Sequence, residues 1–515
     1  QSKPGNNESQ GWQNAWQNEA STYAVEVVNT DDVVKSVNFA RENNLRLVVK
    51  GAGHDYLGRS NAPDSLLVWT HNMRDITYHE DFTPQNCLSH KLDVSAVTVS
   101  AGTRWIEAYT EVTTNQHRYV QGGGCTTVGA AGGFPQGGGF GSWSKEYGTG
   151  AGGIIEAEVV TANGDIVIAN ACQNEDLFWA IKGGGGGTFG IVTHLTYRTH
   201  PLPSHFGIMK GEIKAKNAIA YQKLIAQYLT FYRDGLNNEN WGEQFSFKPD
   251  NTMDVFMVSQ GISKSDAEKI WQPFIQWVSS QDDIEFEHAY IDIPSTKVWD
   301  YNFWEQNHPE LVVKNTGPNA RPGEYWWAPN SGEVFSYWYT YQSWWLPMAL
   351  FDQDSIKSTA ATMYQASRLA PVSIQINKGL AGASENAIKL SKNTSMHPEV
   401  LNAGALVIMS YSTSQPQLDK TLQGETKIQQ KVTNINEAMS LIQAMAPNAG
   451  AYANEADYFQ SNWQQTFWGD NYPKLLEIKD KYDPNGLFYC HHCVGSEVWS
   501  GDGMCRTNMK IRISD

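Results

Sequence analysis

Dense clusters of glycine constrain the fold of this chain more than any other feature of its sequence. The chain contains 45 glycines, which gather at 122–124, 129–141, 148–153 and 183–187. Residues without a Cβ let the backbone approach a ligand closely and adopt conformations that other residues avoid. Because these clusters separate strand-like segments, they indicate a backbone that surrounds a bound molecule.

The length and charge of the chain narrow the classes of protein it can belong to. At 515 residues it exceeds the size, about 250–300 residues, at which a single core stops growing, so we expect two domains. A formal net charge of −16 and a pI near 5.3 disfavour a nucleic-acid partner or an anionic membrane surface. We find no apolar run near the roughly 20 residues that a spanning helix needs, and therefore expect a small-molecule substrate and no membrane partner.

Several features favour a secreted protein. The chain starts at Gln1 without a Met or an apolar leader, as expected after removal of a signal peptide or trimming. It carries two glycosylation sequons, at Asn7 and Asn393, and six cysteines.

The Cys490-His-His-Cys493 stretch offers metal-ligand residue types but is too crowded for one ion. We expect no metal there and favour a disulfide between Cys493 and Cys505.

The order of patterns along the chain predicts an α+β protein. A strand at 23–28, a helix at 30–44 capped by Thr30 or Asp31 and a strand at 45–49 form a βαβ-like opening. Further strands are predicted within 94–102, 154–169 and 189–200, and beyond Pro201 the patterns become longer. There, helices at 218–236 and 265–281 alternate with strands at 335–342 and 405–412, and a last helix is predicted within 470–484.

Two nucleophilic residues lie inside the glycine-rich stretches. His54 stands in KGAGHDYLGRS, which lacks the GxGxxG spacing of a Rossmann turn, and Cys125 follows three glycines. An imidazole and a thiolate can each add to an electron-poor ring that lies flat against such loops. The alternatives are an ordinary loop histidine and a buried, inert thiol.

Taken together, these stretches resemble one family of flavoenzymes. The matching segments are GAGHDYLGRS at 51–60, CTTVGAAGGFPQGGGFG at 125–141, DLFWAIKGGGGGTFGIV at 176–192 and NYPKLLEIKDKYDPNGLF at 471–488. They resemble the bicovalent oxidases related to berberine bridge enzyme, within the vanillyl-alcohol-oxidase type FAD family. The resemblance implies a two-domain FAD-binding fold, with the FAD domain at 15–201 and 451–505 and an antiparallel-sheet substrate domain at 202–450.

The resemblance also implies a covalently held FAD and a set of residues around it. His54 would carry the 8α-methyl group of the flavin and Cys125 would carry its ring carbon 6, while Val128 is typical of members that react quickly with oxygen. The other cofactor-binding residues implied are Lys50, Gly51, Ala52, Gly53, Asp55, Tyr56, Gly58, Ser60, Gly124, Gly129, Gly138, Gly139, Gly190, Ile191, Val192 and Asn471.

The substrate side differs from that of carbohydrate-oxidising relatives. Many of those show Tyr-x-Asn-Tyr-x-Asp, and here Glu455 replaces the second tyrosine, after Tyr452. Glu455 can accept an alcohol proton if burial raises its pKa, and Tyr452 is the alternative; a structural hydrogen bond or ion pair is the other interpretation of Glu455. Tyr337, Tyr339 and Tyr341 are predicted on one strand face opposite Trp338, either as a substrate cage or as core.

These observations predict an FAD-dependent oxidase that converts an alcohol to a carbonyl and reduces molecular oxygen to hydrogen peroxide. The stretches KGAGHDYLGRS, ANEADY and, at the end, CHHCVGSEVW also resemble the fungal branch that includes isoamyl alcohol oxidase, which favours a primary alcohol. The alternatives are a dehydrogenase, an oxidative cyclase of a specialised metabolite or a carbohydrate oxidase. From another class, a protein that keeps the flavin fold only to bind a carbohydrate or partner would share these motifs.

Overall fold

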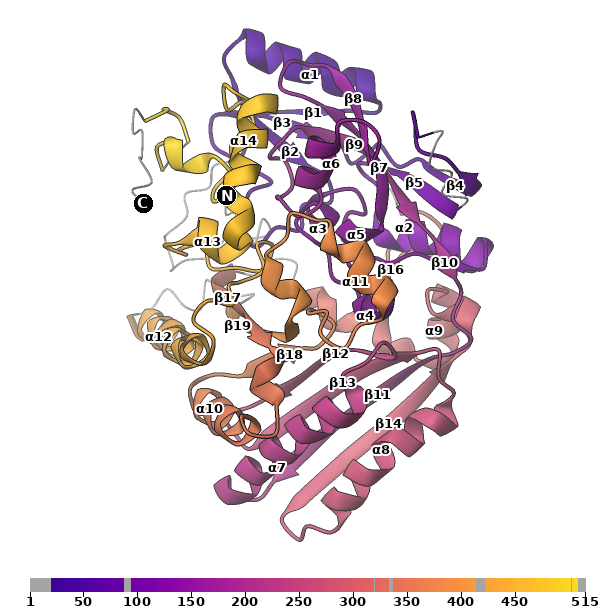
Figure 1. Ribbon diagram of the computed structural model, residues 1–515, viewed down its shortest axis with the longest axis vertical. Helices are drawn as coiled ribbons and strands as arrows, with labels where there is room; N and C mark the ends of the chain where they lie inside the picture. The colour runs from indigo at the N-terminus through magenta and orange to yellow at the C-terminus, as the bar shows by residue number, and fades with distance from the viewer. Residues whose placement is uncertain are drawn as a thin grey trace.

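The structure is a computed structural model that describes residues 20–87, 94–318, 320–332, 337–413, 422–501 and 503–507. Its upper part in Figure 1 contains the first third of the chain together with the C-terminal segment, and its lower part contains the middle of the chain. This is the two-part arrangement that the sequence predicts. The predicted boundaries at 201 and 450 stay a prediction, and residues 15–19 lie outside the described residues.

A small parallel sheet opens the upper part. Its strands run in the order β1 (Tyr23–Glu26), β3 (Ser65–Trp69) and β2 (Arg46–Lys50), and α1 (Thr30–Glu42) connects β1 to β2. The βαβ opening is confirmed, although β3, which was not predicted, lies between the two strands. The cap of α1 is Asn29, whose side chain accepts a hydrogen bond from Asp32 N at 2.9 Å. The prediction of Thr30 or Asp31 as cap was therefore wrong, because an asparagine one residue earlier reaches the third amide of the helix.

A five-stranded antiparallel sheet completes the upper part and confirms the strands predicted within 94–200. Its order is β4 (Ile76–Phe82), β5 (Val94–Ser100), β9 (Ile191–Arg198), β7 (Ile154–Val160) and β8 (Ile166–Asn170). A two-stranded pair joins β6 (Arg118–Tyr119) to β10 (His200–Pro201). Short helices lie between the strands: α2 (Trp105–Tyr109), α3 (Gly133–Gln136), α4 (Ser144–Tyr147), α5 (Gly150–Gly153) and α6 (Glu175–Ile181). Of these, α3 and α5 are formed by residues of the glycine clusters.

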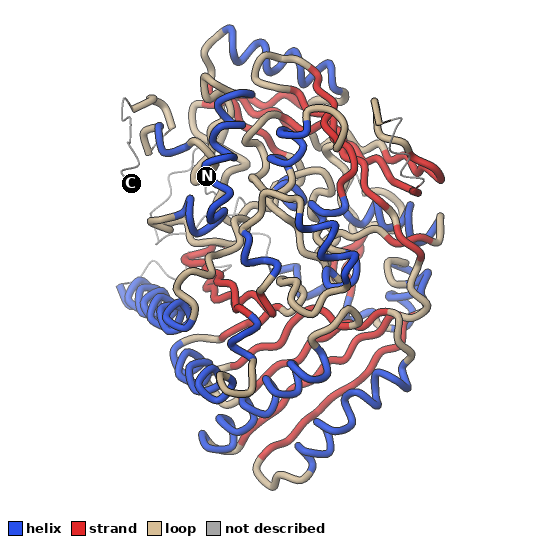
Figure 2. Tube along the Cα trace, viewed as in Figure 1, coloured by secondary structure: helices blue, strands red, loops and turns tan. Residues whose placement is uncertain are grey.

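The lower part is a seven-stranded antiparallel sheet, as the resemblance implies. Its order is β14 (Ile284–Ile293), β11 (Phe206–Ala215), β13 (Thr252–Gln260), β12 (Trp241–Phe247), β18 (Val372–Gln375), β19 (Ala403–Thr413) and β17 (Tyr337–Pro347). The helices α7 (Ala218–Phe231), α8 (Lys264–Ser279), α10 (Ile356–Leu369) and α12 (Leu422–Met445) cover its outer face (Figures 1 and 2). Its other face is turned toward the upper part.

Shorter elements lie between the two parts. They are α9 (Tyr301–Asn307), the hairpin of β15 (Val312–Lys314) and β16 (Tyr325–Trp327), and α11 (Glu385–Lys392). β12 comes especially close to the upper part, since a Cβ on Gly242 would lie 1.6 Å from Ser142 O. Only glycine fits at this crossing, which brings the next residue of β12, Glu243, against the glycine-rich loop.

The C-terminal segment returns to the upper part through α13 (Trp463–Trp468) and α14 (Tyr472–Tyr482) (Figure 1). The buried Lys479 ammonium donates to Asp483 Oδ2 at 2.6 Å, Thr188 O at 2.7 Å and Phe488 O at 2.8 Å. Phe488 forms a parallel bridge with Leu47 of β2. The motif at 471–488 is thereby fixed both to β2 and to the loop that follows the five glycines at 183–187.

A β-bulge changes the facing predicted for the aromatic residues of β17. The register shifts between Trp338 and Thr340, so that Trp338 and Tyr341 both contact the Tyr56 ring, at 5.3 and 4.1 Å between centroids. Tyr339 instead stacks on Tyr411. The predicted shared face of Tyr339 and Tyr341 opposite Trp338 was therefore wrong, because an extra residue reverses the alternation; the side chain of Tyr337 lies outside the described part of the chain.

The disulfides also differ from the prediction. Cys490 bonds to Cys493 and Cys87 bonds to Cys172, so the predicted Cys493–Cys505 bridge was wrong. A tight turn, closed by a hydrogen bond from Cys493 N to Cys490 O, brings the Cα atoms of this pair within 5.4 Å, which suits a disulfide. Among the described residues, no His, Cys, Asp and Glu side chains form a group of three that suits a metal ion, and no helix has the length and apolar character needed to cross a bilayer.

Candidate active site

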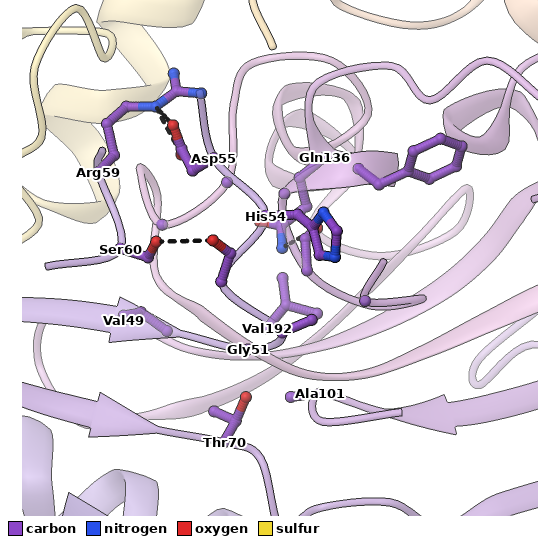
Figure 3. A pocket seen from close by; sticks show the side chains of 18 of the residues that line it. Val49, Gly51, His54, Asp55, Arg59, Ser60, Thr70, Ala101, Gln136 and Val192 are labelled. Atoms are coloured by element: carbon purple, nitrogen blue, oxygen red, sulfur yellow. Dashed lines mark hydrogen bonds and ion pairs between the residues drawn. The ribbon is translucent and has the colours of Figure 1, made fainter. Parts of the chain in front are cut away.

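A narrow cleft runs through the upper part, between β2, the His54 loop and the loops of the glycine clusters at 129–141 and 183–187. Figure 3 shows the side chains that surround it, including His54 and Val192. Arg59 and Asp55 form an ion pair at its edge, with 2.9 Å between Arg59 Nε and Asp55 Oδ2. Gly53, at a φ of +88°, supplies a left-handed turn that only glycine adopts easily just before His54.

The cleft has the properties expected of a flavin nucleotide site. A Cβ built on Gly133 or Gly187 would meet no atom within 4 Å, although both residues line the cleft. At these points the bare backbone faces open space, where amide N–H groups can contact a flat ring or a phosphate. The residues present therefore fit FAD.

A larger cavity of about 640 Å³ lies between the cleft and the seven-stranded sheet. Its lining is rich in aromatic side chains, among them Trp299, Trp304 and Trp327, and includes Cys125. His54 and Val128 line both this cavity and the cleft. The two spaces therefore meet at the histidine and the valine singled out by the sequence.

Thr127 links the two nucleophilic residues. Its Oγ1 lies 2.9 Å from His54 Nε2 and 3.5 Å from Cys125 Sγ. His54 lies deep in the molecule with its ring exposed to the internal cavity, and burial lowers its pKa to about 4. At neutral pH the imidazole is therefore uncharged and one ring nitrogen has a lone pair, as a nucleophile requires. Cys125 belongs to neither disulfide.

Most of the predicted cofactor residues come together around these spaces. The cleft is lined by Gly51, Ala52, Gly53, His54, Asp55, Ser60, Val128, Gly129, Gly190, Ile191 and Val192, and the larger cavity adds Tyr56, Gly124 and Cys125. Lys50, Gly58, Gly138, Gly139 and Asn471 line neither space. The last three pack inside the protein: a Cβ on Gly138 would lie 2.8 Å from Met396 Sδ, and Asn471 Nδ2 donates to Met396 O at 2.7 Å.

The two predicted catalytic residues both line the larger cavity, in different settings. Glu455 forms an ion pair with Lys378, whose Nζ lies 2.6 Å from Oε1 and 2.5 Å from Oε2. The Tyr452 hydroxyl accepts hydrogen bonds from Gly139 N at 3.1 Å and Asn454 Nδ2 at 3.0 Å. Burial raises the pKa of Tyr452 far above its usual value, so its phenol stays protonated at neutral pH.

Sequence reasoning missed three polar residues of the site: Thr127, Lys378 and Glu243. Thr127 stands two residues after Cys125, so its place in that motif was a usable signal. Lys378 follows β18, and Glu243 lies within β12 at a φ of +71°; both approach the cavity only because the seven-stranded sheet packs on the glycine loops. A local sequence pattern carries no sign of that packing.

Comparison with protein families and curated proteins gives consistent matches. Residues 21–170 match the FAD binding domain family, and residues 451–495 match the berberine and berberine like family. An uncharacterized FAD-linked oxidoreductase of Arthroderma benhamiae is 32% identical over 501 residues, covering 94% of this chain and 79% of the relative. The FAD-linked oxidoreductase easE of Aspergillus fumigatus is 31% identical, covering 95% of this chain and 74% of the relative.

Solved structures share the same fold. The VAO-type flavoprotein MtVAO615 of Myceliophthora thermophila is 27% identical with a TM-score of 0.77, covering 94% of this chain and 82% of that one. Glucooligosaccharide oxidase of Acremonium strictum, whose FAD is described as 6-S-cysteinyl, 8α-N1-histidyl, has a TM-score of 0.71 at 18% identity over 96% of both chains. At that identity the likeness concerns the fold alone.

Proposed function

Because this chain belongs to the berberine-bridge-enzyme-like, vanillyl-alcohol-oxidase type family of FAD-linked oxidoreductases, we propose that it is an oxidase that converts an alcohol to a carbonyl compound. FAD, when bound, accepts a hydride at N5 and passes the electrons to oxygen, which yields hydrogen peroxide. We propose that His54 and Cys125 hold this FAD covalently. The histidyl and cysteinyl linkages named for glucooligosaccharide oxidase use the same two residue types.

The observation that carries the proposal is the meeting of the cleft and the larger cavity at His54 and Val128. The residues at this junction would hold a flavin ring where the cleft and a substrate-sized space meet. Thr127 contacts both His54 Nε2 and Cys125 Sγ, so two attachment points on one ring system are within reach. Val128 at the junction is the residue we expect to leave room for oxygen.

The character of the larger cavity supports an organic alcohol as the substrate. Aromatic walls, including Trp299 and Trp327, can enclose an apolar body. The Lys378–Glu455 pair supplies a charged donor and acceptor at the same cavity, and we propose that it binds and orients a substrate hydroxyl. The Tyr452 hydroxyl stays protonated and accepts hydrogen bonds from two N–H groups. It is a further polar group of the cavity that can position the substrate.

Secretion is a further part of the proposal. The two disulfides suit an oxidising compartment. Asn393, at the end of α11, is exposed, so a glycan at that sequon would extend into solvent. The Asn7 sequon lies outside the described residues.

The experiment that tests the activity is anaerobic mixing of the purified holoprotein with a panel of aliphatic, aromatic and sugar alcohols. We expect at least one alcohol to bleach the visible flavin absorbance, and oxygen to restore it with one peroxide formed per carbonyl product. A protein that no alcohol bleaches would contradict the proposal. Bleaching without peroxide formation on exposure to oxygen would identify a dehydrogenase instead.

The size of the cavity favours one alternative function. About 640 Å³ is far more than a short aliphatic alcohol fills and matches a drug-sized molecule. An oxidative cyclase of a ring-containing metabolite would use the same cofactor and cavity. Such an enzyme would bleach with a bulky amine or phenol substrate and not with simple alcohols, which the same panel distinguishes once those compounds are added.

A further inference from the structure

We infer that Glu243, on β12 of the seven-stranded sheet, is the residue that accepts the proton of the substrate hydroxyl. This inference rests on the proposed function and names a different residue from the two that the sequence suggests. Its carboxyl group lines the larger cavity together with Cys125 and His54.

The backbone at Glu243 is held in an unusual conformation. Its φ is +71°, although it lies inside β12. On one side this strand pairs with β13. On the other side Glu243 O accepts a hydrogen bond from Ile376 N at 2.9 Å. A residue with a Cβ adopts this region at an energetic cost, and such residues concentrate at functional sites. The contact between Gly242 and Ser142 O fixes the strand at this point, so the side chain is aimed at the glycine loop.

The carboxyl group of Glu243 adjoins the residue proposed to carry the flavin. Its Oε1 would lie 3.4 Å from a Cβ on Gly124, the residue before Cys125, and it accepts a hydrogen bond from Ser142 Oγ. The flavin carbon assigned to Cys125 is separated by one ring-junction carbon from N5. If Cys125 holds that carbon, a carboxylate beside Cys125 would lie near N5, where a substrate presents its C–H bond.

Electrostatics distinguish Glu243 from the other candidates. Burial raises the pKa of Glu243, opposed by the Ser142 hydrogen bond and the charge of Lys378. Glu455 has both oxygens engaged by Lys378, and the Tyr452 phenol stays protonated. The charge of Lys378, beyond β18, acts on Glu243, and the charge of Glu243 acts on Tyr109 of α2 and Tyr119 of β6. The titratable groups His54, Cys125, Tyr452 and Glu455 line the same cavity as Glu243.

The proposed step balances as a two-electron oxidation. As the substrate C–H bond breaks, its electron pair leaves as hydride to the oxidised FAD. The O–H bond breaks at the same carbon, its electron pair forms the carbonyl bond, and its proton passes to the Glu243 carboxylate. Ser142 stabilises the carboxylate before transfer, and the neutral acid afterwards suits the buried surroundings.

The test compares Glu243→Gln with a matched control, Glu239→Gln, which changes an exposed residue four positions earlier. Both variants are checked for flavin content, and their anaerobic bleaching rates are measured across pH with an alcohol that bleaches the wild type. We expect Glu243→Gln to keep its flavin, to bleach about 10²–10⁴-fold more slowly and to lose the fall in rate at acid pH, since that fall reports protonation of the base. Glu239→Gln should match the wild type.

Ser142→Ala is a milder variant that tests the same group if Glu243→Gln fails to fold. Removing the donor that stabilises the carboxylate should move the acid fall in rate to higher pH. Infrared difference spectra between acid and neutral pH need no substrate: the wild type should show the carbonyl band of a buried carboxylic acid, and Glu243→Gln should lack it.

Three results would overturn the role of Glu243 and leave the proposed oxidase function standing. They are a bleaching rate in Glu243→Gln within about threefold of the wild type, an acid fall that disappears in Glu455→Gln and persists in Glu243→Gln, and an acid fall that does not move in Ser142→Ala. A wild type that no alcohol bleaches would instead overturn the proposed function, and the proton-accepting role with it.

Discussion

At the scale of single residues, the site depends on one short contact chain. Thr127 Oγ1 lies between His54 Nε2 and Cys125 Sγ. With Nε2 held by the threonine, the other ring nitrogen, Nδ1, is the one left for the proposed bond to the flavin. The glycines around His54 and Cys125 give the two side chains room, and Thr127 gives the imidazole its orientation.

Replacing Thr127 tests this orientation. In a Cys125→Ala background, where only the histidine can hold FAD, we expect Thr127→Val to slow covalent attachment about fivefold, because a hydrogen bond worth about 1 kcal/mol is lost. Thr127→Ser keeps the hydroxyl and should attach FAD at the parental rate. The measurement is the fraction of denatured chain that carries FAD, followed by mass against time after FAD is added. Equal rates for the valine and serine variants would contradict the role.

At the scale of elements, the C-terminal helix α14 acts as a clamp on the FAD-binding part. Lys479 and Asp483 are buried, and Asp483 also accepts from Leu487 N at 2.8 Å and Phe488 N at 2.9 Å. The charged residues of the motif at 471–488 therefore have a structural role. Asp483 closes the turn after α14, and Lys479 connects the helix to Thr188. The loop after the five glycines is held in place by a segment almost 300 residues away along the chain.

Two lysines on α14 provide a matched comparison. Lys479→Met leaves Asp483 and two carbonyl groups buried without their cation, so we expect a loss of about 3–5 kcal/mol in the free energy of unfolding. Lys481→Met removes an exposed ion pair with Asp176 and should cost less than about 1 kcal/mol. Denaturant unfolding of the holoproteins measures both. Equal losses in the two variants would contradict the clamp.

Some of the helices and strands could be predicted from the sequence, and others could not. Hydrophobic patterns predict the strands within 94–200 and the helices α7 and α8, because local periodicity determines them. The pattern does not reveal the bulge after Trp338, nor β3, nor the pairing of Cys490 with Cys493. Each depends on a backbone geometry or a neighbour that the local sequence does not encode.

At the scale of the whole molecule, the candidate site needs residues from both the upper and the lower part. The upper part has the cleft and both nucleophilic residues, and the seven-stranded sheet brings Glu243 and Lys378 to the same cavity. Sequence motifs point to the first set, since His54 and Cys125 stand in recognisable local patterns. They do not point to the second set, because only packing between the parts gives those residues a common cavity.

The intact mass of the denatured holoprotein shows whether His54 and Cys125 are both points of covalent attachment. We expect an adduct of FAD mass on the wild type and on both His54→Ala and Cys125→Ala, and no adduct on the double variant. A wild type without an adduct, or an adduct that survives in the double variant, would contradict the assignment of His54 and Cys125 as the two points of attachment.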